Sequence, residues 1–203
     1  DNDELKNIEN IEYTGSISAH LYGDEGDNFI LGGSGADLLY GGDGNDILKP
    51  WEGDDTVYGE AGDDVLILKG SGNQSFNGGA DNDTLEIDHS DWTTMPTGFV
   101  GEANLTEGWV GEHLNPTKVG TDSVDLVENI TLYGDVDYVV RGDTQDNILE
   151  TKGGDDKLYG GDGDDILKSG AGDDEVYGEG GNDTIIHNGS GTQYYDGGAD
   201  NDT

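Results

Sequence analysis

The chain has 203 residues, of which 46 are Asp or Glu, 8 are Lys or Arg and 37 are Gly, and its formal net charge is −38. This charge excludes nucleic acid as a partner because phosphate would be repelled, and the absence of cysteine excludes disulfides, thiolate metal sites and cysteine nucleophiles. With only 31% hydrophobic residues, the chain must either stay disordered or use bound cations in place of a large core.

The chain repeats at a long period of 119 residues: residues 1–84 align without a gap with 120–203, and about half of the positions are identical. Such repeats indicate a solenoid, in which each unit contacts mainly its neighbours. In chain order we expect a leading strand segment (1–21), a first repeat array (22–86), a non-repetitive segment (87–119), a second leading strand segment (120–141) and a second, truncated array (142–203).

The arrays themselves have a period of nine residues. From Gly23 the first array reads GDEGDNFIL, GGSGADLLY, GGDGNDILK, PWEGDDTVY and GEAGDDVLI, and one extra residue, Leu68, precedes its last two repeats. The extra residue recurs in the second copy as His187. Glycines at positions 1, 2 and 4 predict turns with positive φ and close backbone approach.

Position 8 of the nonapeptide is apolar in nearly every repeat. In a three-residue strand the middle side chain points to the face opposite its neighbours, so these residues predict a thin core of stacked side chains. The pattern therefore indicates short parallel strands that alternate with turns. The residues are Ile30, Leu39, Leu48, Val57, Leu66, Phe76 and Leu85, then Leu149, Leu158, Leu167, Val176, Ile185 and Tyr195.

Position 6 carries the candidate metal ligands. Ca²⁺ takes six to eight oxygen ligands and mixes carboxylates with backbone carbonyls. A glycine-rich turn exposes its carbonyls, and an aspartate at its end adds a charged oxygen. The position-6 aspartates are Asp37, Asp46, Asp55, Asp64 and Asp83 in the first array, and Asp156, Asp165, Asp174, Asp183 and Asp202 in the second.

The motif GGxGxD followed by x, a large apolar residue and x resembles the RTX repeats of haemolysin-type calcium-binding proteins. The resemblance implies two right-handed parallel β-rolls, in which each nonapeptide forms half a coil and Ca²⁺ lies between turns two repeats apart. It pairs Asp37 with Asp55, Asp46 with Asp64, Asp156 with Asp174 and Asp165 with Asp183. The implied carbonyl ligands are those of Gly33, Gly35, Gly42, Gly44, Gly161 and Gly163. Amides coordinate more weakly than carboxylates, so Asn28 and Asn147 at position 6 predict weaker sites at the array ends.

Catalytic interpretations are weaker than the repeat interpretation. Asp54–Asp55 or Asp173–Asp174 could form the acid and base of a glycosidase, but these pairs recur at the repeat period and fit the ligand role. The four histidines lack metal-ligand spacing, and no phosphate-binding GxxxxGK[ST] motif occurs. We therefore expect a protein that is not an enzyme.

Position 9 carries Tyr22, Tyr40 and Tyr58 at spacings of 18 residues, as well as Tyr159 and Tyr177. Eighteen residues make one coil, so these rings are expected to stack on the outer face. Outward strand positions often carry aromatic residues for packing alone. The alternative is that Tyr22, Tyr40 and Tyr58 form a docking face for a neighbouring roll or for residues 87–119, which contain Trp92, Phe99 and Trp109.

The resemblance implies an extracellular protein, exported unfolded by type I secretion, that folds when it meets calcium. No apolar run approaches the about 20 residues of a membrane helix, and no signal-peptide pattern opens the chain, so no transmembrane segment is predicted. We expect a fragment of a longer protein. The chain is then either a structural tandem repeat of an adhesin, sheath or layer, or the calcium-dependent folding module of a toxin or hydrolase.

Overall fold

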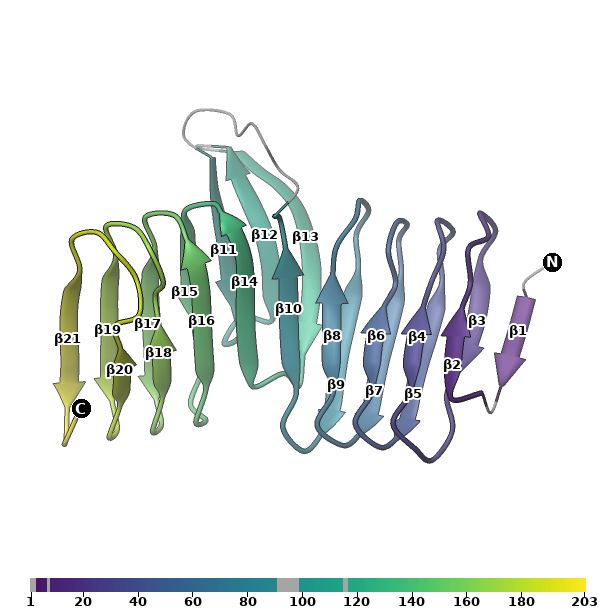
Figure 1. Cartoon of the computed structure of the whole chain (residues 1–203), viewed down its shortest axis with the longest axis horizontal. Helices are drawn as coiled ribbons and strands as arrows, with labels where there is room; N and C mark the ends of the chain where they lie inside the picture. Colours follow the sequence, from purple (N-terminus) through teal and green to yellow (C-terminus); the bar gives the residue numbers. More distant parts are fainter. Residues whose placement is uncertain (1–2, 7, 91–98, 115–116) are drawn as a thin grey trace. The chain divides into compact units, whose positions relative to one another are not determined.

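The computed structural model describes residues 3–6, 8–90, 99–114 and 117–203. Within these ranges every regular element is a β-strand, which confirms the predicted all-β class. The chain forms two compact units, one of Asp1–Ile87 with Asp122–Val127 and the other of Asp88–Thr121 with Glu128–Thr203. Each unit is a parallel β-solenoid in which successive strands alternate between two sheets (Figure 1).

In the first unit, the odd-numbered strands up to β9 form one sheet and the even-numbered strands up to β10 form the other. One sheet holds β1 (Asp3–Lys6), β3 (Ala19–Tyr22), β5 (Leu38–Asp43), β7 (Thr56–Ala61) and β9 (Ser75–Ala80), and the other holds β2 (Asn10–Glu12), β4 (Phe29–Leu31), β6 (Ile47–Lys49), β8 (Val65–Leu68) and β10 (Thr84–Asp88). Neighbouring strands are parallel and pair residues one coil apart, as Leu21 does with Leu39. The last residues of β13 (Thr117–Asp125) pair with β9.

The second unit repeats this arrangement. One sheet holds β15 (Tyr138–Arg141), β17 (Lys157–Asp162), β19 (Glu175–Gly180) and β21 (Tyr194–Ala199), and the other holds β14 (Asn129–Asp135), β16 (Ile148–Gly153), β18 (Ile166–Lys168) and β20 (Thr184–Ile186). In addition, β11 (Phe99–Asn104) and β12 (Trp109–Leu114) form an antiparallel hairpin, and β11 pairs with β15. The sequence makes no prediction of the fold of segment 87–119, and the structure shows that it contains a hairpin. Trp92 lies outside the described residues.

The position-8 side chains fill the space between the two sheets. All of them from Ile30 to Leu85 and from Leu149 to Val176 are at most 1% exposed, and burial of each such side chain contributes about 1.5–3 kcal/mol. The prediction is wrong for the last coil, where Ile185 is only half-buried and Tyr195 is 38% exposed. Within the described chain, no further strand covers β20 and β21 there.

The turn glycines have two different roles. Positions 2 and 4 take positive φ in many repeats, as Gly42 (117°) and Gly44 (111°) do, but Gly33 and Gly35 at the same positions do not. Position 1 does not, which corrects the expectation that all three glycines supply positive φ. Gly41 at position 1 is required by space instead, because a Cβ there would lie 2.1 Å from Oδ2 of Asp46.

Candidate metal centre

The position-6 aspartates form a ladder along each unit. The backbone N–H of Asp37 donates to Oδ1 of Asp55 over 2.7 Å, and that of Asp46 donates to Oδ1 of Asp64 over 2.8 Å. In the second unit, Asp156 and Asp174 are joined in the same way, and so are Asp165 and Asp183. The structure thus brings together all four pairs that the resemblance implies, and one oxygen of each acceptor is used by the backbone.

The second carboxylate oxygen is different. Oδ2 is buried and accepts no hydrogen bond in Asp46, Asp64, Asp165 and Asp183. Burial raises the pKa of Asp46 to about 6 and the pKa values of Asp64 and Asp165 to about 7, although a backbone N–H bound to each carboxylate opposes the shift. Burial likewise raises the pKa of Asp183. A buried charge without compensation is costly, so the series of Oδ2 atoms requires either protons or cations.

A backbone carbonyl converges with each of these Oδ2 atoms. A Cβ on Gly41 would lie 2.1 Å from Oδ2 of Asp46 and 2.6 Å from the carbonyl oxygen of Gly59, one coil further on. In the second unit, a Cβ on Gly160 would lie 2.3 Å from Oδ2 of Asp165 and 2.6 Å from the carbonyl oxygen of Gly178. Glycine at position 1 therefore lets a carboxylate oxygen and a carbonyl oxygen lie close against the turn, and these are the ligand types that Ca²⁺ prefers.

The carbonyls at position 4 face the next coil. Those of Gly35, Gly44 and Gly163 point at the position-4 glycines Gly53, Gly62 and Gly181, where a Cβ would lie 1.9, 2.2 and 1.9 Å away. Ligation by these carbonyls, and by those of Gly33, Gly42 and Gly161, stays a prediction.

Two of the predicted aspartates have both oxygens occupied. Asp37 accepts N–H groups from Ala19 on Oδ1 and from Gly33 on Oδ2. Asp174 accepts the N–H of Asp156 on Oδ1 and the side-chain amide of Gln193 on Oδ2, at 3.3 Å. These two carboxylates need a cation less than Asp46, Asp64, Asp165 and Asp183 do.

Amide side chains take the place of aspartate at the array ends. Asn28 keeps an oxygen in the usual position, because a Cβ on Gly23 would lie 1.8 Å from its Oδ1 and 2.0 Å from the carbonyl oxygen of Gly41. Its Nδ2 donates to the carbonyl of Gly26 over 2.6 Å. An N–H thus satisfies this turn carbonyl without a bound cation.

The other amides follow the same rule. Asn147 donates to the carbonyl of Glu128 (2.8 Å), Gln74 to Gly53 (3.0 Å) and Gln193 to Gly172 (2.8 Å). These amide side chains donate hydrogen bonds to backbone carbonyls without a metal. They therefore add no further uncompensated carboxylate to the ladders.

Sequence reasoning missed a second ladder, at position 5. The N–H of Asn45 donates to Oδ1 of Asp27 and the N–H of Asp63 donates to Oδ1 of Asn45, each over 3.0 Å. In the second unit Asp155 donates to Asp137, over 2.7 Å. The side-chain oxygen accepts from the following coil here, whereas at position 6 it accepts from the preceding coil. The recurrence of Asp or Asn at position 5 is the signal that could have indicated it.

The stacked coils and their oxygen-lined turns define a parallel β-solenoid with repeated sites for a hard cation. More than half of the chain matches the RTX calcium-binding nonapeptide repeat, over residues 13–48, 52–68, 70–86, 141–176 and 159–189. The chain therefore belongs to the RTX calcium-binding repeat family, as its nonapeptides predict, and it is a Ca²⁺-binding repeat region. No curated protein matches it.

The described ranges contain no cluster of three or more His, Cys, Asp or Glu side chains arranged around a metal position. They also contain no helix that is long and apolar enough to cross a membrane.

Proposed function

We propose that Ca²⁺ binding between the turns drives folding of both units. The observation that carries this proposal is the row of buried Oδ2 atoms without hydrogen-bond partners at Asp46, Asp64, Asp165 and Asp183. At neutral pH these carboxylates repel one another and lack solvation, and the thin core offsets little of that cost. A divalent cation supplies the positive charge that compensates these buried carboxylates.

Folding and binding are then one process. A preformed site does not exist in the open chain, so the free energy of metal binding becomes free energy of folding. Extracellular calcium sites of low affinity fill at roughly millimolar concentration. The chain is therefore open in a calcium-poor cytoplasm and folded outside the cell, which suits export of an unfolded chain by type I secretion.

The test is far-UV circular dichroism of the whole chain during titration with Ca²⁺ after removal of metal by a chelator. We expect a change from coil to β-structure, and a much weaker response to Mg²⁺, which demands tighter octahedral geometry. A β-spectrum that persists unchanged in excess chelator would contradict the proposal.

For the biological role, we propose a structural tandem repeat of a secreted or cell-surface protein such as an adhesin, sheath or layer. The ungapped 119-residue repeat supports this role, because a tandem unit can be copied to build length. Self-association through Tyr22, Tyr40 and Tyr58 belongs to the same proposal. The second candidate, a folding module of an RTX toxin or hydrolase, is supported by family membership. The full-length sequence separates the two: further copies of the unit support the first, and an attached catalytic domain supports the second.

A further inference from the structure

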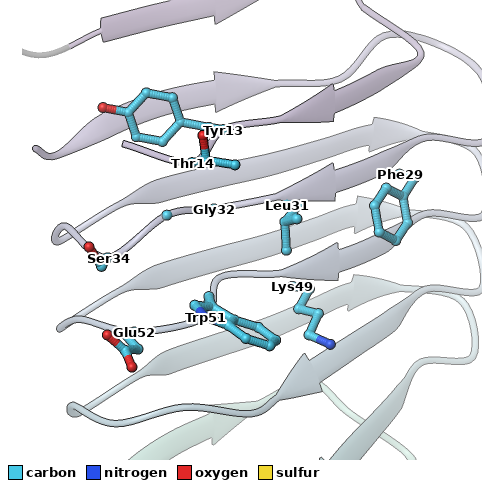
Figure 2. A pocket seen from close by; sticks show the side chains of 10 residues that line it. Tyr13, Thr14, Phe29, Leu31, Gly32, Ser34, Lys49, Trp51 and Glu52 are labelled. Atoms are coloured by element: carbon cyan, nitrogen blue, oxygen red, sulfur yellow. The ribbon is translucent and has the colours of Figure 1, made fainter. Parts of the chain in front are cut away.

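The first unit carries a pocket beside its calcium turns, and the turn residues Gly32, Gly33, Ser34, Trp51 and Glu52 form part of its lining. It lies on the outer face of β4 and β6, has a volume of about 460 Å³, and is lined by ten residues. Phe29, Leu31 and Lys49 reach it from strand positions 7 and 9, which point away from the core. Figure 2 shows Trp51 beside Lys49, with Ser34 and Glu52 at the turn end of the pocket and Phe29 at the other end.

Trp51 in this pocket has an unfavourable backbone conformation. Its φ is 82° and its side chain is 39% exposed, although a bulky residue strongly disfavours positive φ. The corresponding residue of the second copy is Gly170, with a φ of 72°. The turn therefore suits glycine, and the first unit holds a strained, exposed indole in its place. Glu60 (82°) and Glu179 (77°) have the same backbone conformation at position 2, so the positive φ belongs to the turn, and the exposed indole is what distinguishes this coil.

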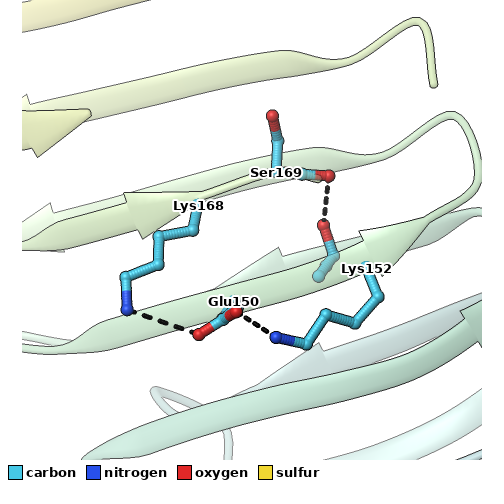
Figure 3. Close-up of polar contacts among 5 residues, drawn as sticks. Glu150, Lys152, Lys168 and Ser169 are labelled. Atoms are coloured by element: carbon cyan, nitrogen blue, oxygen red, sulfur yellow. Dashed lines mark hydrogen bonds and ion pairs between the residues drawn. The ribbon is translucent and has the colours of Figure 1, made fainter. Parts of the chain in front are cut away.

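The two copies also differ at the pocket. About half of all aligned positions are identical, but of the ten lining residues only Lys49 has an identical counterpart, Lys168. Leu31 corresponds to Glu150 and Gly33 to Lys152. In the second unit, Glu150 forms ion pairs with Lys152 and, over 3.3 Å, with Lys168 (Figure 3). The coil thus tolerates an ion-pair network at these positions, so the aromatic pocket is not a requirement of the fold.

The lining combines a flat apolar surface with polar groups at its edge. The ring of Trp51 and the exposed ring of Phe29 (38%) offer the apolar part. The Lys49 ammonium group lies over the Trp51 ring, 4.6 Å from its centre, so a ligand ring that packs on that face of the indole must displace it. Glu52 and Ser34 add a carboxylate and a hydroxyl. The Tyr13 hydroxyl, which donates to the carbonyl of Ile17 over 3.2 Å, fixes another ring at the edge.

We propose that this pocket binds a neutral carbohydrate. A pyranose ring has an apolar C–H face that packs on an indole, and hydroxyl groups at its edge that both donate and accept hydrogen bonds. Lys49 can donate to such hydroxyls and Glu52 can accept from them, which matches their opposite charges. An anionic ligand would be repelled by a chain of net charge −38, and a hydrocarbon would leave the polar groups at the edge without partners. Pockets of a few hundred Å³ that combine aromatic walls with a few polar groups are typical of small-ligand sites.

The test is binding of the calcium-loaded chain to an array of neutral and sialylated glycans, followed by saturation-transfer NMR with the best neutral oligosaccharide. Trp51→Gly introduces the residue of the second copy, which relieves the strain of a bulky side chain at positive φ and removes the stacking surface. Leu31→Glu introduces the counterpart of Glu150, which we expect to bind Lys49 and narrow the pocket. Ile186→Ala removes an exposed apolar side chain from the second unit and serves as the matched control.

We expect binding to neutral glycans, a loss of at least tenfold in affinity for Trp51→Gly and Leu31→Glu, and no change for Ile186→Ala. Calcium-induced circular dichroism should remain intact in all three variants. Three results would overturn the proposal: no glycan bound, equal binding by wild type and both pocket variants, or binding to sialylated glycans as tight as binding to neutral ones.

Discussion

The N–H of Asp46 donates to Oδ1 of Asp64 over 2.8 Å, while Oδ2 of Asp64 is buried and accepts no hydrogen bond. One oxygen of the carboxylate thus connects two coils, and the other is left for a cation. Because one side chain has both roles, substitutions in and beside the ladder should change calcium binding and stability to different extents.

Removal of an interior carboxylate should weaken calcium binding more than removal of an end amide. Asp46→Ala deletes an uncompensated Oδ2 together with a ladder acceptor, whereas Asn28→Ala deletes an amide that is already hydrogen-bonded. Calorimetric titration should give a loss for Asp46→Ala that exceeds the loss for Asn28→Ala by about tenfold or more in affinity, or about 1.4 kcal/mol. Equal losses would contradict the assignment of the metal to the interior turns.

A calcium site can be added at the end of the first array. In Asn28→Asp, the carboxylate takes the place of an amide whose Oδ1 already lies beside the carbonyl of Gly41, and the N–H that binds the Gly26 carbonyl is lost. We expect one additional bound Ca²⁺ by calorimetry, and a metal-free state that is destabilised by about 1–3 kcal/mol. Asn45→Asp, at the exposed position 5, is the control and should leave the stoichiometry unchanged. An unaltered count for Asn28→Asp would show that the turn lacks other necessary ligands.

The room available for a Cβ atom, rather than the loss of a glycine as such, should determine how much a glycine-to-alanine substitution costs. Gly41→Ala places a Cβ 2.1 Å from Oδ2 of Asp46, whereas at Gly26 the nearest atom would lie 3.6 Å away. We expect Gly41→Ala to abolish one calcium site and to lower the free energy of unfolding by about 1–3 kcal/mol, and Gly26→Ala to have little effect. Chemical denaturation in saturating Ca²⁺ measures the difference, and similar losses for the two variants would be inconsistent with a spatial role.

The metal-free chain should gain β-structure on acidification. Burial raises the pKa of Asp46 to about 6 and that of Asp64 to about 7, above the usual value of about 4. The folded form therefore binds protons more tightly than the open chain, and its stability increases as the pH falls from about 8 through 6. In the presence of Ca²⁺ the trend reverses, because protons compete with the metal for the same oxygens. Circular dichroism of metal-free protein across this pH range tests the sign, and a loss of β-structure between pH 8 and 5 would disprove it.

The tyrosine rings at position 9 stack as the repeat spacing predicts. The ring centres of Tyr22 and Tyr40 are 4.9 Å apart, and those of Tyr40 and Tyr58 are 5.0 Å apart. Replacement of Tyr40 and Tyr58 by Ser should leave calcium-induced β-structure in place, because position 9 contacts neither the core nor the carboxylate ladder. Each lost ring pair should cost about 0.5–1.5 kcal/mol. If the face mediates self-association, sedimentation velocity should also show weaker assembly for the double variant than for the wild-type chain.

The sequence predicted the coils well because their physical determinants are local and periodic. Position 8 defines the core, and the Asp37–Asp55 and Asp46–Asp64 pairs are those that the resemblance to RTX repeats implies. The occupied oxygens of Asp37 and Asp174 could not be predicted, because their partners Gly33 and Gln193 depend on the backbone path of individual turns. The β11–β12 hairpin was missed because its residues have no counterpart at the repeat period.

The two side-chain ladders give each stack of coils a direction. At position 6 a coil donates its N–H to the coil that follows, as Asn28 does to Asp46, and at position 5 it accepts from that coil, as Asp27 does from Asn45. The leading and trailing surfaces of a coil therefore present opposite hydrogen-bonding patterns. Two such surfaces are complementary only in head-to-tail order, the kind of contact that extends into an open filament rather than closing into a symmetric dimer.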